Sequence, residues 1–364
     1  MLKVILSGGG TGGHIYPAVS VAEELHKILG DKVDILFVGA EGKMEMDKIP
    51  ALGYKIVGLP VAGLQRRLTL KNLALPFKIV KSLNKAKSVI KKFNPDIVVG
   101  FGGYASAPIL WTAQKAKIPT VIQEQNSYAG VTNKILSKKA DKICVAYDGM
   151  NRFFPDEKII HTGNPVRGNF TNLSERTIAS EFFHLSPYKK TILITGGSLG
   201  TRTLNNAVLK YYDTLKDSDI QIIWQTGKFY EKEINGQIEN RKADNIWHGA
   251  FIERMDYAYA ACDIIIARAG ASTVSELCLL GKPVIFVPSP NVAEDHQTKN
   301  ALALSSVGAA ELIKDSDAVE KVIPAALELL KDPEKMAQMS QKIRGMGIVD
   351  SASRITDIIL KLIK

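Results

Sequence analysis

Short apolar runs rich in β-branched residues alternate along the chain with longer stretches of helical periodicity. Five such runs in the first half have the character of buried parallel strands: residues 3–6, 33–38, 96–99, 120–122 and 142–145. Residues 16–29 have helical periodicity, with Pro17 at the start and Gly30 after the end. Repeated strand–helix units predict a parallel sheet that is covered by helices on both faces.

The same pattern restarts in the second half of the chain. Residues 191–195 (TILIT) lead into residues 196–200 (GGSLG), the second glycine loop, much as residues 4–6 lead into residues 8–13 (GGGTGG), the first glycine loop. Further strands are predicted at residues 220–224, 263–267 and 283–287. Two similar openings in one chain predict an α/β protein with two Rossmann-like domains.

We place the domain boundary in the turn-rich stretch 163–167 (GNPVR). The expected domains are residues 1–163 and residues 164–345. A last helix, at about residues 346–364, has no strand after it and could pack back on the first domain.

Composition narrows the class of protein. The 364 residues are 46% apolar and 23% charged, which excludes collagen, coiled coil and disorder. No apolar run reaches the roughly 18 residues of a membrane span, and the start of the chain does not resemble a signal peptide. Cys144, Cys262 and Cys278 form no CxxC pair, so we expect a reducing cytoplasm and no disulfide. The six histidines show no metal-binding spacing, so no metal site is predicted.

The net charge of +10 is concentrated in one segment. Residues 48–95 contain eleven Lys or Arg and no Asp or Glu, whereas the rest of the chain holds 36 basic and 37 acidic residues. This basic segment predicts an anionic partner: nucleic acid, an acidic membrane or a phosphorylated substrate.

The first glycine loop contains GxGxxG between a strand and a helix, where unpaired amides favour a phosphate. Glu41 stands roughly where a dinucleotide site needs an acidic residue, so a dehydrogenase is one alternative, and a turn without ligand is another. His14 follows the loop in the first helical turn. It could be a general base with a pKa lowered by the helix end, or a histidine that only caps the helix.

The second glycine loop fits two motifs. It could be a phosphate cradle around Ser198, or a GxSxG nucleophile elbow with Asp263 and His296 completing a triad. We favour the cradle, because this loop opens its domain and repeats the first loop.

Two polar segments follow later strands. In residues 268–276, Thr273 and Glu276 have the spacing of a capping box, but the Glu276 carboxylate could instead hold the two hydroxyls of a ribose. Residues 295–300 could recognise sugar hydroxyls or form an ordinary helix cap.

Taken together and in this order, these motifs resemble the MurG family of bacterial peptidoglycan glycosyltransferases, which add N-acetylglucosamine from a UDP donor to lipid I. The matching segments are 9–14 (GGTGGH) with Pro17 and Ala18, 102–108 (GGYASAP), 124–126 (EQN), 162–167 (TGNPVR), 196–198 (GGS), 268–276 (RAGASTVSE) and 295–297 (DHQ). They span nearly the whole chain.

The resemblance implies a GT-B architecture, in which two Rossmann-like domains place the active site in their cleft. It implies an inverting transfer from UDP-GlcNAc to the 4-hydroxyl of MurNAc in lipid I, without cofactor or bound metal, with the first glycine loop on the acceptor side and the second on the donor side. His14 would be the base or orient the acceptor. The donor contacts carried over by motif are Thr11, Gly12, Gly13, Asn126, Arg167, Ser198, Ile252, Ala271, Ser272, Thr273, Val274, Ser275, Glu276 and Gln297.

Two positions depart from the family pattern. Gln123 stands where a histidine is expected, and Glu253-Arg254 replaces an acidic pair. Another GT-B transferase with a different lipid or soluble acceptor, and a nucleotide-binding module without activity, remain alternatives to the family's reaction.

A lipid-linked acceptor implies that the enzyme works on a membrane surface, here the cytoplasmic face of the bacterial cell membrane. In the basic segment, an apolar stripe of Val80, Leu83, Ala86, Ile90 and Phe93 is expected to face the core. Leu73, Leu75 and Phe77 would enter the lipid interface. The basic residues Arg66, Arg67, Lys71 and Lys78 would lie near anionic head groups. The segment has few interleaved aromatic residues, which disfavours nucleic acid.

Overall fold

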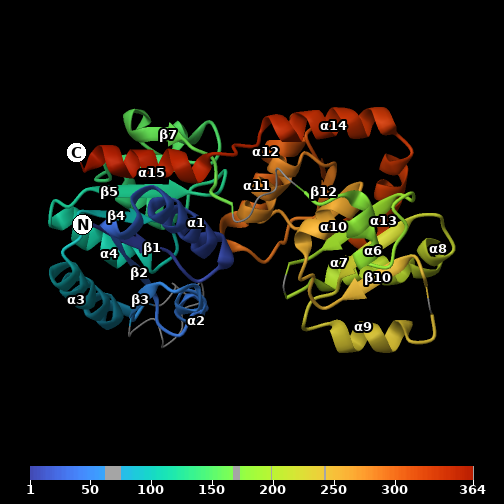
Figure 1. The fold of residues 1–364 in the computed structure, drawn as a ribbon, viewed down its shortest axis with the longest axis horizontal. Helices are drawn as coiled ribbons and strands as arrows, with labels where there is room; N and C mark the ends of the chain where they lie inside the picture. The colour runs from blue at the N-terminus through green and yellow to red at the C-terminus, as the bar shows by residue number, and fades with distance from the viewer. Residues whose placement is uncertain (62–74, 167–172, 198, 242, 364) are drawn as a thin grey trace. The chain divides into compact units, whose positions relative to one another are not determined.

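The computed structural model describes residues 1–364 except 62–74, 167–172, 198, 242 and 364 (Figure 1). The chain divides into two compact units. Unit 1 contains Met1–Arg167 and Ile348–Lys364, and unit 2 contains Gly168–Gly347. The chain therefore crosses from unit 1 to unit 2 and returns for its last helix.

Unit 1 is built on a sheet of seven parallel strands in the order β3-β2-β1-β4-β5-β6-β7. The strands are β1 (Leu2–Ser7), β2 (Val33–Ala40), β3 (Lys55–Leu59), β4 (Ile97–Gly100), β5 (Thr120–Glu124), β6 (Lys142–Val145) and β7 (Ile159–His161). The helices are α1 (Gly12–Leu29), α2 (Glu45–Lys48), α3 (Leu75–Phe93), α4 (Ser106–Lys115), α5 (Val131–Ser137) and α15 (Ser351–Leu362).

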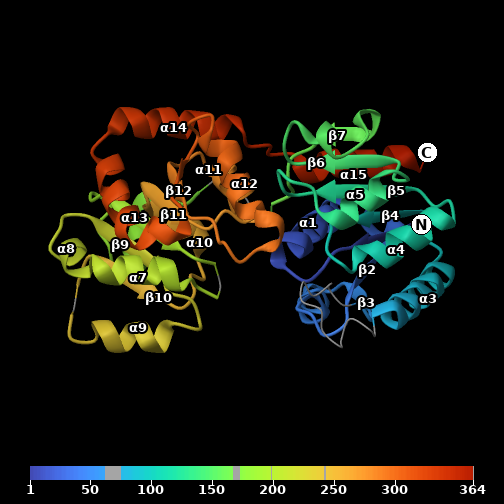
Figure 2. The ribbon, with the colours of Figure 1, turned by 180° about the vertical axis from the view of Figure 1, so that it is seen from behind.

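The strand alternation of unit 1 directs apolar side chains to two cores. Val4 and Leu6 of β1 pack with α1 and α15 on one face, whereas Ile5 packs with α3, α4 and α5 on the other (Figures 1 and 2). The C-terminal helix α15 contacts α1, which explains its place in unit 1. The sheet is thus covered on both faces, as the apolar runs predict.

Unit 2 repeats the arrangement with six parallel strands in the order β10-β9-β8-β11-β12-β13. The strands are β8 (Thr191–Thr195), β9 (Gln221–Gln225), β10 (Ile246–Gly249), β11 (Ile264–Ala267), β12 (Val284–Phe286) and β13 (Glu311–Leu312). The helices are α6 (Arg176–Phe182), α7 (Arg202–Lys210), α8 (Tyr212–Lys216), α9 (Glu231–Ile238), α10 (Met255–Ala261), α11 (Ala271–Leu280), α12 (His296–Ser305), α13 (Asp315–Leu330) and α14 (Pro333–Gly345).

Four strands were missed by the sequence pattern: β3, β7, β10 and β13. Each lies at an edge of its sheet and is only partly buried, so none forms a continuous apolar run. Helix α1 also begins earlier than expected, at Gly12 instead of Tyr16. Pro17 lies inside it and removes one backbone donor near its beginning.

Each sheet has one point where the order of strands reverses. In unit 1 the chain leaves β1 toward β2 and β3, then returns to pair β4 with β1; in unit 2 the same reversal lies between β8 and β11. Ligands of such sheets bind beyond the carboxyl ends of the strands at this reversal. The two glycine loops follow β1 and β8, the central strands at these points. Among the described residues, no helix has both the length and the apolar character needed to cross a bilayer.

Candidate functional site

The first glycine loop packs against the glycines that follow β4. Gly102 and Gly103 have φ values of +88° and +78°, and a Cβ at Gly103 would lie 2.5 Å from the carbonyl oxygen of Gly9. A Cβ at Gly102 would lie 3.2 Å from the ring of His14. Only glycine permits this backbone conformation and this approach, so the loops after β1 and β4 enclose the His14 imidazole.

The His14 ring is oriented by the loop that precedes it. Its Nδ1 lies 3.0 Å from the carbonyl oxygen of Gly9 and 3.2 Å from Oγ1 of Thr11. Because a carbonyl only accepts hydrogen bonds, Nδ1 carries the proton in this arrangement, and Nε2 is the nitrogen that accepts one. This tautomer has the form that a general base requires.

A carboxylate that the sequence analysis missed lies beneath the first glycine loop. Glu45 is 1% exposed and accepts hydrogen bonds from the amides of Gly10, at 3.1 and 3.2 Å, and Ala40, at 2.9 Å. A Cβ at Gly39 would lie 2.5 Å from Cγ of Glu45. The Gly10 amide is therefore bound to the protein's own anion. The amides of Gly12 and Gly13, which begin α1, have no acceptor among the described residues.

This arrangement does not fit a dinucleotide. Glu41, the acidic residue expected for a ribose in that alternative, forms an ion pair with Lys85 at 2.7 Å, and both side chains are exposed. The Gly10 amide is bound to Glu45 as well, so one amide of the fingerprint is not available to a dinucleotide.

Asn126 is held in place by a buried carboxylate at the end of β5. Glu124 is 2% exposed and accepts hydrogen bonds from the backbone and side-chain amides of Asn126, at 3.1 and 3.3 Å. Asn133 of α5 donates to the same carboxylate at 2.8 Å. Gln123, the departure from the family pattern, is fully buried and donates to Asn164 at 2.8 Å. An amide has no basic nitrogen, so Gln123 joins strand β5 to the loop after β7 and performs no proton transfer.

In the described part of the second glycine loop, the backbone amides donate hydrogen bonds to uncharged oxygens. The Gly197 amide donates to Oγ1 of Thr195 at 3.3 Å, and the Gly200 amide donates to the Gly197 carbonyl at 2.9 Å. Ser198 lies outside the described residues, as does Arg167. A Cβ at Gly200 would approach Cα of Gly227 to 2.8 Å, so this glycine allows close packing of the loops after β8 and β9.

The nucleophile-elbow alternative is wrong. Asp263 accepts a hydrogen bond from the Thr191 amide at 2.8 Å and pairs with Arg176 at 2.8 Å. Thr191 begins β8, whereas the second glycine loop follows its other end, about 15 Å away at the rise of a strand. Asp263 therefore lies at the amino edge of the sheet and supports a helix–strand junction.

The capping box predicted for residues 273–276 is also wrong. Helix α11 begins at Ala271, with Gly270 as its N-cap, so Thr273 already lies inside the helix. The amides of its first turn have no side-chain cap, which leaves them available to an anion. Oγ of Ser272 is buried with no partner in the described part of the chain. Ser275 donates to the Ala271 carbonyl at 3.0 Å.

Glu276 is a carboxyl whose pKa is strongly perturbed by burial. Burial raises the pKa of its carboxyl to about 7, against the opposing effect of a hydrogen bond from the Tyr259 hydroxyl at 3.2 Å. A carboxyl pKa near 7, in the helix that follows a central strand of a parallel sheet, is typical of a functional site.

Other expected donor contacts lie on the neighbouring loops. Gln297, in the first turn of α12, accepts a hydrogen bond from the Ser289 amide at 2.9 Å, in the loop after β12. Ile252 and Val274 are 2% and 1% exposed, so their side chains pack inside unit 2 and only their backbones could contact a ligand. Asp295 bonds to the hydroxyl of Thr298 at 2.6 Å and does not cap α12 through its side chain.

The expected residues lie at the carboxyl ends of the strands in each of the two sheets. The loops after β1, β4 and β5 carry Thr11–Gly13, His14 and Asn126 in unit 1. The loops after β8, β11 and β12 carry the second glycine loop, the start of α11 and Gln297 in unit 2. Both sets lie beyond the carboxyl ends of adjacent strands, where the topology predicts a ligand.

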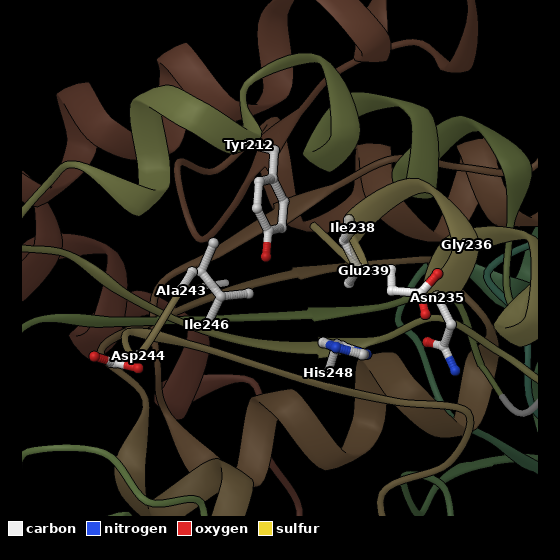
Figure 3. A pocket seen from close by; sticks show the side chains of 9 residues that line it. All are labelled: Tyr212, Asn235, Gly236, Ile238, Glu239, Ala243, Asp244, Ile246 and His248. Carbon is white, nitrogen blue, oxygen red and sulfur yellow. The ribbon is translucent and has the colours of Figure 1, made fainter. Parts of the chain in front are cut away.

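Unit 2 also contains a pocket of about 510 Å³ (Figure 3). It lies between α8, α9 and the edge strand β10, and it contains none of the expected site residues. Its lining residues are Tyr212, Asn235, Gly236, Ile238, Glu239, Ala243, Asp244, Ile246 and His248. Burial lowers the pKa of His248, so this imidazole is neutral at pH 7. The chemistry of the loops, not this pocket, identifies the candidate site.

The basic segment is described only in part. Arg66, Arg67, Lys71 and Leu73 lie outside the described residues, and α3 begins at Leu75. Phe77 is 80% exposed, and Lys78 is exposed beside it. Val80, expected to face the core, is 57% exposed, because the inward stripe of α3 begins one turn later at Ser82 and Ala86. The first turn of α3 therefore presents an apolar and basic surface.

Comparisons with known proteins agree across the whole chain. Residues 4–145 match the glycosyltransferase family 28 N-terminal domain, and residues 191–355 match its C-terminal domain. The chain is 54% identical to a protein of Parabacteroides distasonis, covering 99% of this chain and 98% of that one, and 48% identical to one of Porphyromonas gingivalis, covering 100% and 96%. Both are named UDP-N-acetylglucosamine--N-acetylmuramyl-(pentapeptide) pyrophosphoryl-undecaprenol N-acetylglucosamine transferase.

Solved structures give the same result. The crystal structure of Acinetobacter baumannii MurG is similar with a TM-score of 0.79 and 30% identity, covering 99% of this chain and all of that one. A UDP-GlcNAc 2-epimerase from Neisseria meningitidis bound to UDP-GlcNAc has a TM-score of 0.67 at 17% identity, which shows a shared fold alone.

Proposed function

The chain belongs to glycosyltransferase family 28 and to its MurG group, and on that premise we propose the reaction that it performs. It transfers N-acetylglucosamine from UDP-GlcNAc to the 4-hydroxyl of MurNAc in lipid I and so forms lipid II for peptidoglycan synthesis. The observation that carries this proposal is the identity of 48–55% to transferases of that name over nearly the full length of the chain. The GT-B architecture with two parallel-sheet units agrees with it.

The donor belongs to unit 2 in this proposal. The uncapped amides that begin α11, together with the second glycine loop, would bind the diphosphate and stabilise the charge that develops as UDP leaves. The Glu276 carboxylate would accept hydrogen bonds from the two ribose hydroxyls. The backbone at Ile252 and the amide of Gln297 would contact the base and the sugar. Ser198 and Arg167 complete the expected set.

The acceptor belongs to unit 1. Nε2 of His14 would take the proton of the 4-hydroxyl as its oxygen attacks the anomeric carbon, or would orient that hydroxyl by a hydrogen bond. The Gly9 carbonyl holds the required tautomer. The first glycine loop would also face the acceptor's pyrophosphate, while Thr11, Gly12, Gly13 and Asn126 at this edge would contact the UDP-GlcNAc donor, as the family resemblance implies.

A direct assay tests the reaction. Purified protein mixed with UDP-GlcNAc and lipid I should release UDP and yield a lipid that carries both sugars. No release with lipid I, but release with another lipid-linked or soluble acceptor, would support the alternative transferase. UDP binding without release with any acceptor would support a nucleotide-binding module.

We also propose that the protein works as a peripheral protein on an anionic membrane, at its cytoplasmic face. An acceptor anchored in a bilayer requires the enzyme to come to its surface. The exposed Phe77 and Lys78 on α3, with the basic residues of segment 48–95, support this placement, since each basic residue near such a surface contributes about 1 kcal/mol.

Vesicle sedimentation tests the membrane proposal. The protein should bind vesicles rich in anionic lipid and dissociate as salt rises. Changing Arg66, Arg67 and Lys71 to Glu should abolish binding, whereas the same change at the exposed Lys228, Lys232 and Lys331 of unit 2 should not. Equal binding to neutral vesicles would refute the electrostatic part, and salt-sensitive binding to RNA instead would favour the nucleic-acid alternative.

A further inference from the structure

We propose that Tyr259 is a positioning residue for the sugar-nucleotide donor. Its hydroxyl fixes the Glu276 carboxylate in the orientation in which that carboxylate receives the ribose. This inference rests on the proposed donor role of Glu276, and its test is arranged to separate the two.

The contact joins two successive helices across a separation of 17 residues. Tyr259 lies on α10 and Glu276 on α11, with strand β11 between them in the chain. The Tyr259 hydroxyl lies 3.2 Å from Oε2 of Glu276 and donates to it. Tyr259 is only 2% exposed, so its hydroxyl is placed by the packing of α10 and cannot follow a rotating carboxylate.

Tyr259 acts as a donor at every pH of interest. Burial, with the neighbouring Glu276 charge, raises the pKa of its phenol well above the usual value, so the hydroxyl keeps its proton. It therefore always favours the ionised, accepting form of Glu276. Burial works in the opposite direction and raises the pKa of Glu276 to about 7, so at neutral pH the state of the carboxyl depends on this single hydrogen bond.

Other charged groups around α11 are bound elsewhere. Arg344 of α14 donates to the Leu280 carbonyl at the far end of α11. Arg268, after β11, pairs with Asp315 at 2.6 Å and donates to backbone carbonyls. Burial raises the pKa of Cys262, near Tyr259, to about 11, and that of Cys278, on α11, to about 12, so both thiols are neutral. Within the described part of unit 2, Tyr259 is thus the titratable group that hydrogen-bonds to the Glu276 carboxylate.

The geometry divides the carboxylate between two tasks. Oε2 accepts from Tyr259, which leaves Oε1 and the second lone pair of Oε2 for the two adjacent hydroxyls of a ribose. Without the tyrosine hydroxyl, the carboxyl can rotate and protonate, and both changes remove acceptors that the ribose needs. Phenylalanine at this position keeps the ring and removes only the hydroxyl.

Calorimetric titration of the full-length protein with UDP, from about pH 5.5 to about pH 8.5, tests this inference. Wild-type affinity should rise with pH through about 7, because the ionised carboxylate binds the ribose. Tyr259→Phe should bind UDP about tenfold more weakly at pH 7, as for loss of one hydrogen bond to a charged group, with its midpoint at higher pH. Glu276→Gln should bind weakly at all these pH values. Tyr257→Phe, on the same helix, is the matched control and should behave as wild type.

The double variant separates positioning from folding. If Tyr259 acts through Glu276, Tyr259→Phe should add nothing to Glu276→Gln, whereas a general packing defect would lower affinity equally in both backgrounds. An additive loss, or an unchanged affinity and midpoint in Tyr259→Phe, overturns the inference. Normal UDP binding by Glu276→Gln would instead overturn the proposed donor role of Glu276 itself.

Discussion

The two glycine loops have similar sequences, but their backbone amides bind groups of different charge. Both follow the central strand of a parallel sheet and lie at the reversal of strand order. In the first loop the Gly10 amide binds the buried carboxylate of Glu45, whereas in the described part of the second loop the amides of Gly197 and Gly200 bind neutral oxygens. An internal anion therefore binds one amide of the first loop, whereas no carboxylate binds the described amides of the second.

This difference divides the chemistry between the units. The first loop, with its shape fixed by Glu45, presents an oriented histidine and the two amides that begin α1. The second loop has no carboxylate bound to its described amides, and in the proposed reaction it binds the diphosphate together with the uncapped amides that begin α11. We conclude that a glycine-rich motif identifies a place in the fold, while the side chain packed beneath it determines which ligand chemistry that place supports.

The largest effect is expected at His14. His14→Ala should lower the turnover rate by roughly 10²–10⁴-fold, since a proton acceptor is lost, while the affinity for UDP stays close to wild type. Turnover at saturating acceptor and UDP calorimetry measure the two quantities. An unchanged turnover rate would remove His14 from the mechanism and with it the chemical role of the first loop.

Glu276→Gln should have the next largest effect, on the donor side alone. Loss of a charged contact to two hydroxyls should weaken UDP binding by about 1.5–3 kcal/mol. The melting temperature should stay near that of wild type, because Glu276 does not cap α11. An early melting transition with normal UDP binding would show that the residue serves the fold only.

Glu45→Gln tests the internal anion directly. Glutamine has the size of glutamate, but its NH₂ group replaces one of the two oxygens that accept hydrogen bonds. That NH₂ group would face the backbone N–H groups of Gly10 and Ala40, which also donate, so the first glycine loop should become less ordered. We expect the KM for the acceptor to rise about tenfold and stability to fall by about 1–3 kcal/mol, with UDP affinity unchanged. Glu41→Gln, on the exposed partner of Lys85, is the control and should change activity less than about twofold. An equal loss of UDP affinity would show that the two loops do not act separately.

Asp263→Asn should have the smallest effect on activity. Burial by itself would raise the pKa of Asp263, but the hydrogen bonds from Arg176 and the Thr191 amide outweigh this effect and hold the pKa below its usual value. The stability from this group is therefore present above the ordinary Asp pKa of about 3.9 and is lost as pH falls through the lower folded value. The variant should melt earlier near pH 7, with that deficit shrinking in acid, while turnover stays within about twofold. A large loss of turnover would revive the nucleophile-elbow alternative.

The sequence by itself determined the features that depend on local order. Apolar runs predicted the central strands β1, β8 and β11, since a strand buried on both faces must be apolar along its length. The glycines of 8–13 and 196–200 marked the turns after β1 and β8, and the position of His14 at the start of α1 followed from the same turn. The ordered motifs also identified the family, which the comparisons confirm.

Only the tertiary structure decided which side chains meet. Glu45 reaches Gly10 across a separation of 35 residues, and Tyr259 reaches Glu276 from a different helix; no spacing in the sequence signals either contact. The same holds for the corrections: Asp263 has the order of a catalytic triad but lies at the opposite edge of the sheet from the second loop. Sequence spacing predicts contacts within one helix or one turn, where backbone geometry fixes the distance. Contacts between elements depend on the packing of the whole sheet, and there burial and long-range hydrogen bonds determine the roles of these residues.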